Sequence, residues 1–151
     1  MKIAIASDHA GFELKEKLKK YLEELGHEHE DFGTDSNESV DYPDYALKVA
    51  ECVAKKECER GILICGSGMG MCMSANKVPG IRCAACYDVE MARLSREHND
   101  ANVLSMAARL TDEKTAKNIV QVWLTTEFSG GRHLRRVNKI KSIEKKYSKS
   151  I

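Results

Sequence analysis

The chain has 151 residues, 42% of them hydrophobic, which predicts one domain, spanning residues 1–151, whose core needs neither metal nor disulfides. Its 24 Lys and Arg residues balance 23 Asp and Glu residues, and this charge of +1 gives no reason to expect a nucleic acid or a membrane as partner. No apolar run approaches the roughly 20 residues of a membrane span, and no export signal is visible. We therefore expect a cytoplasmic protein with reduced thiols.

Strand and helix patterns alternate through the first half of the chain. Lys2–Ser7 has the pattern of a strand, and Gly11–Leu25 carries apolar residues at the 3.6-residue period of a helix. His27–Phe32 alternates as an edge strand does, and 41–56 is predicted to be helical. The expected apolar face of that second helix consists of Ala46, Leu47, Ala50, Val53 and Ala54.

The alternation continues to the end of the chain. The apolar run Gly61–Ile64, closed by Cys65, predicts a buried parallel strand. The later elements are a helix from Met71 to about Lys77, a strand over Ile81–Cys86, a helix from Asp88 to about Glu97, a strand over Ala101–Met106, a helix opened by Asp112 and a last helix after Gly130-Gly131. The sequence therefore predicts an α/β fold, a three-layer Rossmann-like sandwich with a five-stranded parallel sheet and a C-terminal helix.

The most informative segment for function is the glycine-rich turn Cys65-Gly66-Ser67-Gly68-Met69-Gly70. Cys65 is expected at the carboxyl end of its strand, where open α/β sheets bind ligands. The glycines let successive backbone N–H groups point to one place, and the following helix adds its dipole. We therefore expect the turn to bind an anion, or a substrate oxygen that becomes negatively charged during a reaction. The spacing fits neither a dinucleotide fingerprint nor a P-loop. A cysteine phosphatase would need an Arg soon after Cys65, and none occurs before Arg82.

Other polar residues are predicted near the same edge of the sheet. Ser7-Asp8-His9-Ala10-Gly11 follows the first strand, although Ser7 or Asp8 could simply cap the next helix. His98-Asn99 is expected in a loop that faces the ligand, and Arg109 follows the fifth strand. Arg132 and Arg136 lie four residues apart on the last helix and suit a phosphate, but a solvated basic face explains them equally well.

Two further motifs have simpler explanations than the chemistry they suggest. Cys83-Ala84-Ala85-Cys86 has the spacing of a redox motif, but residues three apart in a strand face opposite sides, which favours two core cysteines. His27, His29 and Asp31 could share one strand face and bind a metal. An exposed polar edge strand is the preferred interpretation, so no metal site is predicted.

Together these motifs resemble the B-type ribose-5-phosphate isomerase family, which belongs with the isomerases of galactose 6-phosphate and allose 6-phosphate. The resemblance extends in order over nearly the whole chain. It rests on Ser7 to Gly11, Cys65 to Gly70, Ala75-Asn76-Lys77, His98-Asn99 and Gly130-Gly131-Arg132-His133 to Arg136. One branch of this family uses a glutamate after the glycine loop as base, and Met71–Lys77 contains no acid, so the thiol is the candidate base.

The resemblance implies an aldose–ketose isomerase of the non-oxidative pentose phosphate pathway that interconverts D-ribose 5-phosphate and D-ribulose 5-phosphate through a cis-enediolate. Cys65 is the implied base, Ser67 helps to move the proton between the enediolate oxygens, and His98 opens the furanose ring. Backbone N–H groups of Gly66, Ser67, Gly68, Met69 and Gly70 would stabilise the enediolate. No metal and no organic cofactor is implied.

The resemblance also assigns substrate contacts and an assembly. Asp8 would hold sugar hydroxyls, Asn99 would contact the substrate, and the phosphate would be gathered by His9, Arg109, Arg132 and Arg136. The implied assembly is a homodimer or homotetramer with a shared active site, in which the neighbour supplies the His98-Asn99 loop and Arg109. Three alternatives stay open: an isomerase of a six-carbon sugar phosphate, a non-catalytic sugar-phosphate-binding module, and a thiol redox protein.

Overall fold

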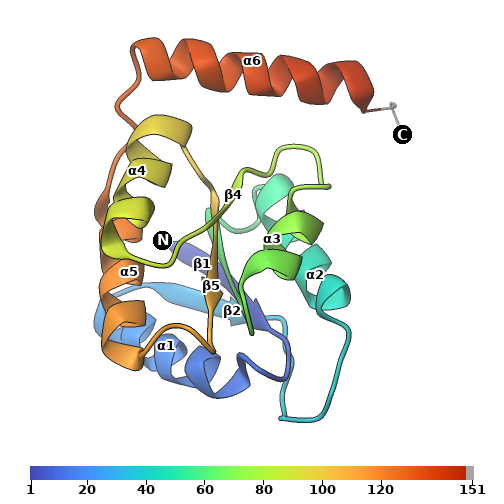
Figure 1. The fold of residues 1–151 in the computed structure, drawn as a ribbon, viewed down its shortest axis with the longest axis vertical. Coiled ribbons are helices and arrows are strands. Elements are labelled where there is room, and N and C mark those ends of the chain that lie inside the picture. The colour runs from blue at the N-terminus through green and yellow to red at the C-terminus, as the bar shows by residue number, and fades with distance from the viewer. Residues whose placement is uncertain (149–151) are drawn as a thin grey trace.

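A computed structural model describes residues 1–148 and shows a five-stranded parallel sheet with helices on both faces (Figure 1). The elements in chain order are β1 (Lys2–Ser7), α1 (Phe12–Glu24), β2 (Glu28–Asp31), α2 (Tyr42–Ala54), β3 (Arg60–Cys65), α3 (Met69–Ala75), β4 (Cys83–Ala85), α4 (Val89–Asn99), β5 (Val103–Ala107), α5 (Glu113–Thr125) and α6 (Arg132–Tyr147). The predicted α/β sandwich is confirmed. The predicted domain end at residue 151 lies outside the described residues.

The order of the strands brings the ends of the predicted site strands together. The sheet runs β2-β1-β3-β5-β4, and all neighbouring pairs are parallel. Ser7 pairs with Ile64, and Cys65 pairs with Ala107, so β1, β3 and β5 end side by side. Because the connections from β1 and β3 leave toward opposite faces, a crevice for a ligand is expected beyond their carboxyl ends.

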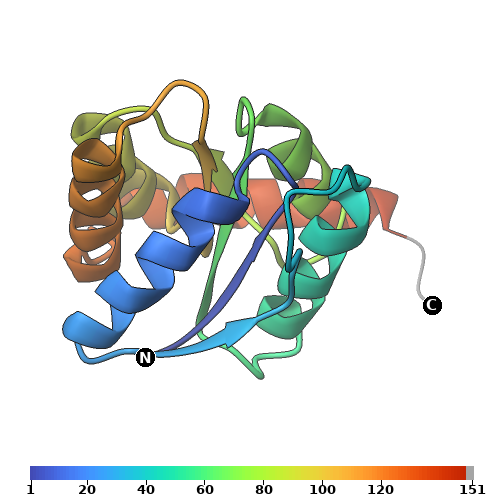
Figure 2. The same cartoon turned by 90° about the horizontal axis from the view of Figure 1, so that it is seen from below.

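Helices cover both faces of the sheet (Figure 2), and an apolar cluster lies between the sheet and the helices on each face. Ile62 and Ile64 of β3 face α1, α4 and α5, where Trp123 is fully buried. Leu63 and Cys65 face α2 and α3 on the other side. This division follows from the strand pleat, which sends successive side chains to opposite faces. Cys65 therefore belongs to the layer formed by α2 and α3.

Helix α6 lies across one end of the molecule and packs against α4 (Figure 1). Its predicted start after Gly130-Gly131 is confirmed. Val137 is its buried residue, whereas four other apolar residues of this helix are between 46% and 75% exposed. These four are Leu134, Ile140, Ile143 and Tyr147. The helix thus carries an apolar face that the rest of the described chain does not cover.

Some predicted boundaries and faces were wrong. Helix α3 begins at Met69 rather than Met71, because Gly68 adopts a left-handed conformation and starts the helix directly. In α2 the predicted core residue Leu47 is 46% exposed, while Val49 and Cys52 are buried in its place. Within residues 1–148, no helix combines the length and hydrophobicity needed to cross a bilayer.

Candidate functional site

The turn after β1 meets the end of β3 through backbone contacts. The Asp8 N–H donates to the Ile64 carbonyl at 3.2 Å, and a Cβ at Gly11 would lie 2.4 Å from that same oxygen. Only glycine permits this approach. The buried Asp8 accepts a hydrogen bond from the Gly11 N–H through Oδ1 at 3.0 Å and so organises this turn. The cap position of α1 is Gly11, and no side chain caps that helix, so the capping alternative for Ser7 or Asp8 is wrong. Asp8 Oδ2 has no hydrogen bond to any residue in 1–148.

The glycine-rich turn after β3 presents unpaired backbone donors. Among residues 1–148, no acceptor is bound to the N–H groups of Gly66, Ser67, Gly68 or Gly70, and the Met69 N–H contacts only Ser67 Oγ, at 3.3 Å. Gly68, with φ of +76°, lets the chain reverse direction here. Several N–H groups without partners in one turn provide what an anion or oxyanion needs.

Three residues that fix this turn were not predicted. The fully buried Ser105 of β5 donates its hydroxyl to the Gly68 carbonyl at 2.6 Å. The Tyr87 hydroxyl donates to the Ser67 carbonyl at 2.9 Å. The Tyr42 ring packs directly on Gly70, where a Cβ atom would lie only 2.5 Å from the ring. Ser105 could have been found, because it is the one polar residue in the otherwise apolar β5. Side chains from other segments thus bind the carbonyl groups of the turn, and its N–H groups are left free to bind a ligand.

Cys65 itself is 4% exposed and packs among the apolar residues between the sheet and α2 and α3. The other cysteines near it differ in acidity. A hydrogen bond from Cys83 lowers the pKa of the Cys72 thiol, while burial raises the pKa of Cys86 to about 11. Cys72, in α3, is therefore the other thiol nearby that could act as a base, and a catalytic role of Cys65 has to be tested against it.

Arg109 lies beside the glycine-rich turn of its own chain. Its N–H donates to the Gly66 carbonyl at 3.1 Å, and a Cβ at Gly66 would lie 3.2 Å from Arg109 Nη1. The expectation that a neighbouring subunit supplies Arg109 is therefore wrong, because β5 pairs with β3 and both strands end at this edge. His9 is also at this edge, and its Nδ1 lies 3.2 Å from the N–H of Val40, so Nε2 carries the proton of the neutral ring.

His98 and Asn99 are not in a loop at this edge, contrary to the prediction. Both belong to the last turn of α4, which Asp100 ends in a left-handed conformation. Because α4 starts after the carboxyl end of β4 and returns to the start of β5, its last turn lies at the amino edge of the sheet. The length of β5 separates the two edges by about 16 Å, so His98 of one chain does not reach Cys65 of that chain.

A second group of basic residues surrounds the end of α4. The His98 ring stacks on the His133 ring, with centroids 4.2 Å apart and planes 11° apart. His133 was not predicted, and it follows Arg132 in the first turn of α6, with Arg136 one turn further along. Partial desolvation, with the nearby His98 and both arginines, lowers the pKa of His133 and favours its neutral ring near pH 7.

The structure thus divides the predicted site residues into two groups at opposite ends of the molecule. We call Asp8, His9, Cys65 to Gly70 and Arg109 the thiol half-site. We call His98, Asn99, Arg132 and Arg136 the histidine half-site. Figure 1 shows α6 and the end of α4 at one end of the strands, and the turns after β1, β3 and β5 at the opposite end.

The two motifs that were assigned simpler explanations can also be placed. Cys83 and Cys86 lie in different apolar clusters, which confirms that they face opposite sides of the sheet. His27 Nδ1 lies 3.2 Å from the amino terminus, and His29 Nε2 lies 2.8 Å from Glu23. Asp31 accepts hydrogen bonds from Lys15 at 2.6 and 2.7 Å. His27, His29 and Asp31 therefore have separate partners and form no shared ligand set.

Comparison with known proteins connects this arrangement to a family. The sequence profile described as Ribose/Galactose Isomerase matches residues 3–140. The chain is 48% identical to ribose-5-phosphate isomerase B of Escherichia coli strain K12 over 145 residues, which are 96% of this chain and 97% of that protein.

Solved structures are similar over the same length. A ribose-5-phosphate isomerase B from Clostridium thermocellum matches with a TM-score of 0.97 at 57% identity, covering 98% of this chain and 100% of that one. The Mycoplasma genitalium ribose-5-phosphate isomerase B with bound ribulose-5-phosphate matches with a TM-score of 0.93 at 41% identity, covering 95% of this chain and 96% of that one.

Proposed function

The chain belongs to the ribose/galactose isomerase family, and we propose that it performs aldose–ketose isomerisation with Cys65 as the catalytic base. The enzyme interconverts D-ribose 5-phosphate and D-ribulose 5-phosphate, in line with its relatives and structural neighbours. The observation that carries the assignment of Cys65 is its place at the end of β3, next to a turn in which the N–H groups of Gly66, Ser67, Gly68 and Gly70 have no partner within residues 1–148.

The reaction moves one proton between neighbouring carbons. Cys65 Sγ takes the proton from C2 of the open-chain aldose, which leaves a cis-enediolate, and returns it to C1. Negative charge develops on O1 and O2, where the free N–H groups of Gly66, Ser67 and Gly68 can donate to it. The Ser67 hydroxyl then passes the proton between the two oxygens. Loss of one such donor costs roughly a hundredfold in rate in other enzymes with oxyanion holes.

The remaining residues of the thiol half-site suit binding rather than proton transfer. Asp8 Oδ2, which has no hydrogen bond within residues 1–148, can accept from sugar hydroxyls. Arg109, beside Gly66, and the Nε2–H of His9 can donate to the phosphate. A phosphate therefore enters at an edge that already carries a guanidinium and an imidazole donor.

We propose that the active site is completed by a second copy of the chain, in a homodimer or in a tetramer built from such dimers. His98, Arg132 and Arg136 lie too far from Cys65 to act within one chain, but in a two-fold dimer each histidine half-site can meet the partner's thiol half-site. The uncovered apolar residues of α6 support this assembly, because they lie next to the histidine half-site. His98 would then open the sugar ring, with Asn99 contacting the substrate.

The cysteines fit a reducing compartment. All six are free thiols, and Cys65 has to be one to act as a base. We propose that the enzyme works in the cytoplasm.

A substrate panel tests the proposed function. Turnover is measured with ribose 5-phosphate, allose 6-phosphate and galactose 6-phosphate, each with and without a chelator. We expect ribose 5-phosphate to react fastest at a rate that chelation leaves unchanged, because the proposed chemistry uses only a thiol, a hydroxyl and N–H groups. Faster turnover of a six-carbon phosphate would reassign the substrate, and loss of turnover with chelator would contradict the mechanism.

Ser105 is proposed as a positioning residue for the turn. We expect Ser105→Ala to lower kcat about tenfold and stability by about 1 kcal/mol, because it removes the hydroxyl that holds the Gly68 carbonyl. Ser95→Ala is the matched control, since Ser95 is also buried and donates to the Ala92 carbonyl at 2.8 Å within its own helix. Kinetics and thermal unfolding are measured for both. Equal effects on kcat in the two variants would show that Ser105 has only a structural role.

A further inference from the structure

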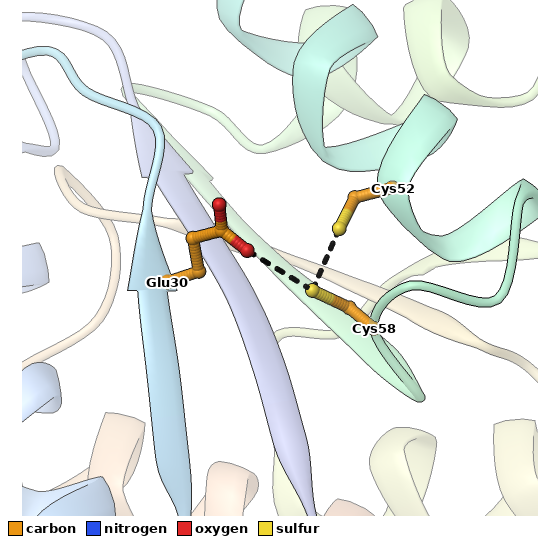
Figure 3. A group of neighbouring side chains, drawn as sticks. All are labelled: Glu30, Cys52 and Cys58. Atoms are coloured by element: carbon orange, nitrogen blue, oxygen red, sulfur yellow. Dashed lines mark hydrogen bonds between the residues drawn. The ribbon is translucent and has the colours of Figure 1, made fainter.

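Three potential metal ligands converge at a place that the isomerase chemistry does not use (Figure 3). Cys58 Sγ lies 2.7 Å from Cys52 Sγ and 3.8 Å from Glu30 Oε2. The two thiols and the carboxylate oxygen all lie within 4.8 Å of one another, and within residues 1–148 no other group of three His, Cys, Asp or Glu side chains does so. Cys52 and Cys58 are 4% and 2% exposed, and the carboxylate faces them from β2.

The local backbone brings the two cysteines together. After α2 the chain reverses through Lys56, which has a φ of +61°. The N–H groups of Glu57 and Cys58 both donate to the Cys52 carbonyl, at 3.0 and 3.2 Å, so Cys58 is folded back onto the end of the helix. Glu30 pairs with Ala4 in the sheet, and Ala4 belongs to the same apolar cluster as both cysteines. The three ligands are therefore held by β2, by α2 and by the turn that follows α2.

We propose that Glu30, Cys52 and Cys58 bind a Zn²⁺ ion, with a water molecule as the fourth ligand. Two thiolates and a carboxylate are ligands that zinc accepts, at about 2.3 Å for sulfur and about 2.0–2.2 Å for oxygen. Tetrahedral ligands at these lengths lie about 3.5–3.8 Å apart, which the Cys58–Glu30 distance of 3.8 Å already satisfies. The sulfurs have to separate by about 1 Å, which rotation of one cysteine side chain about Cα–Cβ supplies.

Binding is a proton-for-metal exchange without electron transfer. The S–H bonds of Cys52 and Cys58 break, two Zn–S bonds form, and two protons leave to solvent. Although the two cysteines are only 4% and 2% exposed, Cys52 lines a cavity of about 210 Å³ and Cys58 lines another of about 590 Å³. The ion would enter from the surface and tie the end of α2 to the edge strand β2.

Lys2 is a built-in competitor for this site. Its Nζ lies 3.3 Å from Glu30 Oε2, and both side chains are nearly half exposed. A bound cation beside the carboxylate has to displace this ammonium group. Removal of the Lys2 charge is therefore expected to strengthen metal binding, whereas removal of the Glu30 charge weakens it.

The site is separate from the thiol half-site. Cys58 precedes β3, whereas Cys65 ends that strand, so the length of β3 places them about 20 Å apart. A metal at Cys58 is expected to stabilise the fold and to leave the isomerisation step unchanged. Ligand binding to the native state raises stability by RT ln(1 + [L]/Kd), so the unfolding temperature should rise with zinc concentration.

A cobalt titration of the full chain, kept reduced by a phosphine, tests the proposal. Co²⁺ replaces Zn²⁺ at such sites and gives a thiolate charge-transfer absorption that zinc then removes by competition. We expect one Co²⁺ per chain in the wild type and loss of the absorption in Cys52→Ala and Cys58→Ala. We expect Kd to rise about tenfold in Glu30→Gln and to fall in Lys2→Met. Cys86→Ala is the control, because this buried cysteine lies in the other apolar cluster.

Three results would overturn the proposal. The first is an absorption that persists in Cys58→Ala, which would place the metal at other thiols. The second is an equal Kd in wild type and Glu30→Gln, a half-exposed substitution that should leave the fold intact. The third is a reduced protein that binds no cobalt. If dissolved oxygen then oxidises its two thiols to a Cys52–Cys58 disulfide once the phosphine is withdrawn, peptide mass mapping would detect the bond. That last result would make the pair a redox pair instead of a metal site.

Discussion

Replacement of Cys65 by alanine is expected to reduce the turnover of ribose 5-phosphate by about a thousandfold or more, since a positioned base contributes about 10²–10⁴-fold and no other group takes its place. Substrate binding should persist, because the N–H groups of the turn and Arg109 are untouched by the change. Turnover is measured by conversion to ribulose 5-phosphate, and binding is measured by calorimetry with the same sugar phosphate.

The control for this experiment is Cys72→Ala. Cys72 lies in α3, directly after the turn, and it is the neighbouring thiol whose pKa is lowered. If Cys65 is the base, Cys72→Ala keeps most of the activity. A collapse of turnover in Cys72→Ala together with substantial activity in Cys65→Ala would transfer the role to Cys72 and refute the proposed mechanism.

Mixed dimers of two variants that are inactive on ribose 5-phosphate, a sugar whose ring has to be opened, are expected to recover about a quarter of the wild-type turnover of this sugar. In a Cys65→Ala homodimer both thiol half-sites fail, and in a His98→Asn homodimer both histidine half-sites fail. Random mixing gives about half heterodimers, and each of these has one intact site of two, made from the unaltered half-sites. The subunits are mixed by joint unfolding and refolding, and activity is compared with each variant refolded alone.

The same mixture distinguishes a shared site from a site within one chain. If His98 acted on the substrate bound by its own chain, every site in the heterodimer would contain one of the two substitutions, and activity would not return. A double variant that carries both changes, mixed with wild type, provides the control for refolding yield. Sedimentation of the wild type checks the assembly, and a monomer with full activity would contradict the shared site.

The fold could be predicted largely because apolar periodicity and glycine positions are local signals. Parallel strands ending at Ser7 and Cys65 required only the run of apolar residues before each turn. The face of α2 was harder, since Leu47 and Val49 are both apolar and differ only by the rotation at which the helix docks. That rotation is set by the packing of the helix on the sheet, and the local sequence pattern of the helix does not indicate it.

The site was predicted less completely, because some of its contacts join distant segments. Tyr87, just after β4, and Ser105, in β5, hold the turn by hydrogen bonds, and no pattern in the sequence around Ser67 indicates these distant partners. The misplacement of His98 had a different cause. A helix that leaves the carboxyl end of one parallel strand must return to the amino end of the next, so residues just before Val103 lie at the amino edge. His98 could therefore have been placed correctly from topology alone.

The most direct test of Cys65 as the base is exchange of the C1 proton of ribulose 5-phosphate in D₂O, followed by proton NMR. This ketose has no free hydroxyl at C5 to close a furanose ring, so exchange requires proton abstraction but no ring opening. Wild type and His98→Asn are predicted to incorporate deuterium at C1, while Cys65→Ala binds the ketose and leaves its protons in place. Exchange in Cys65→Ala at the wild-type rate would contradict the assignment.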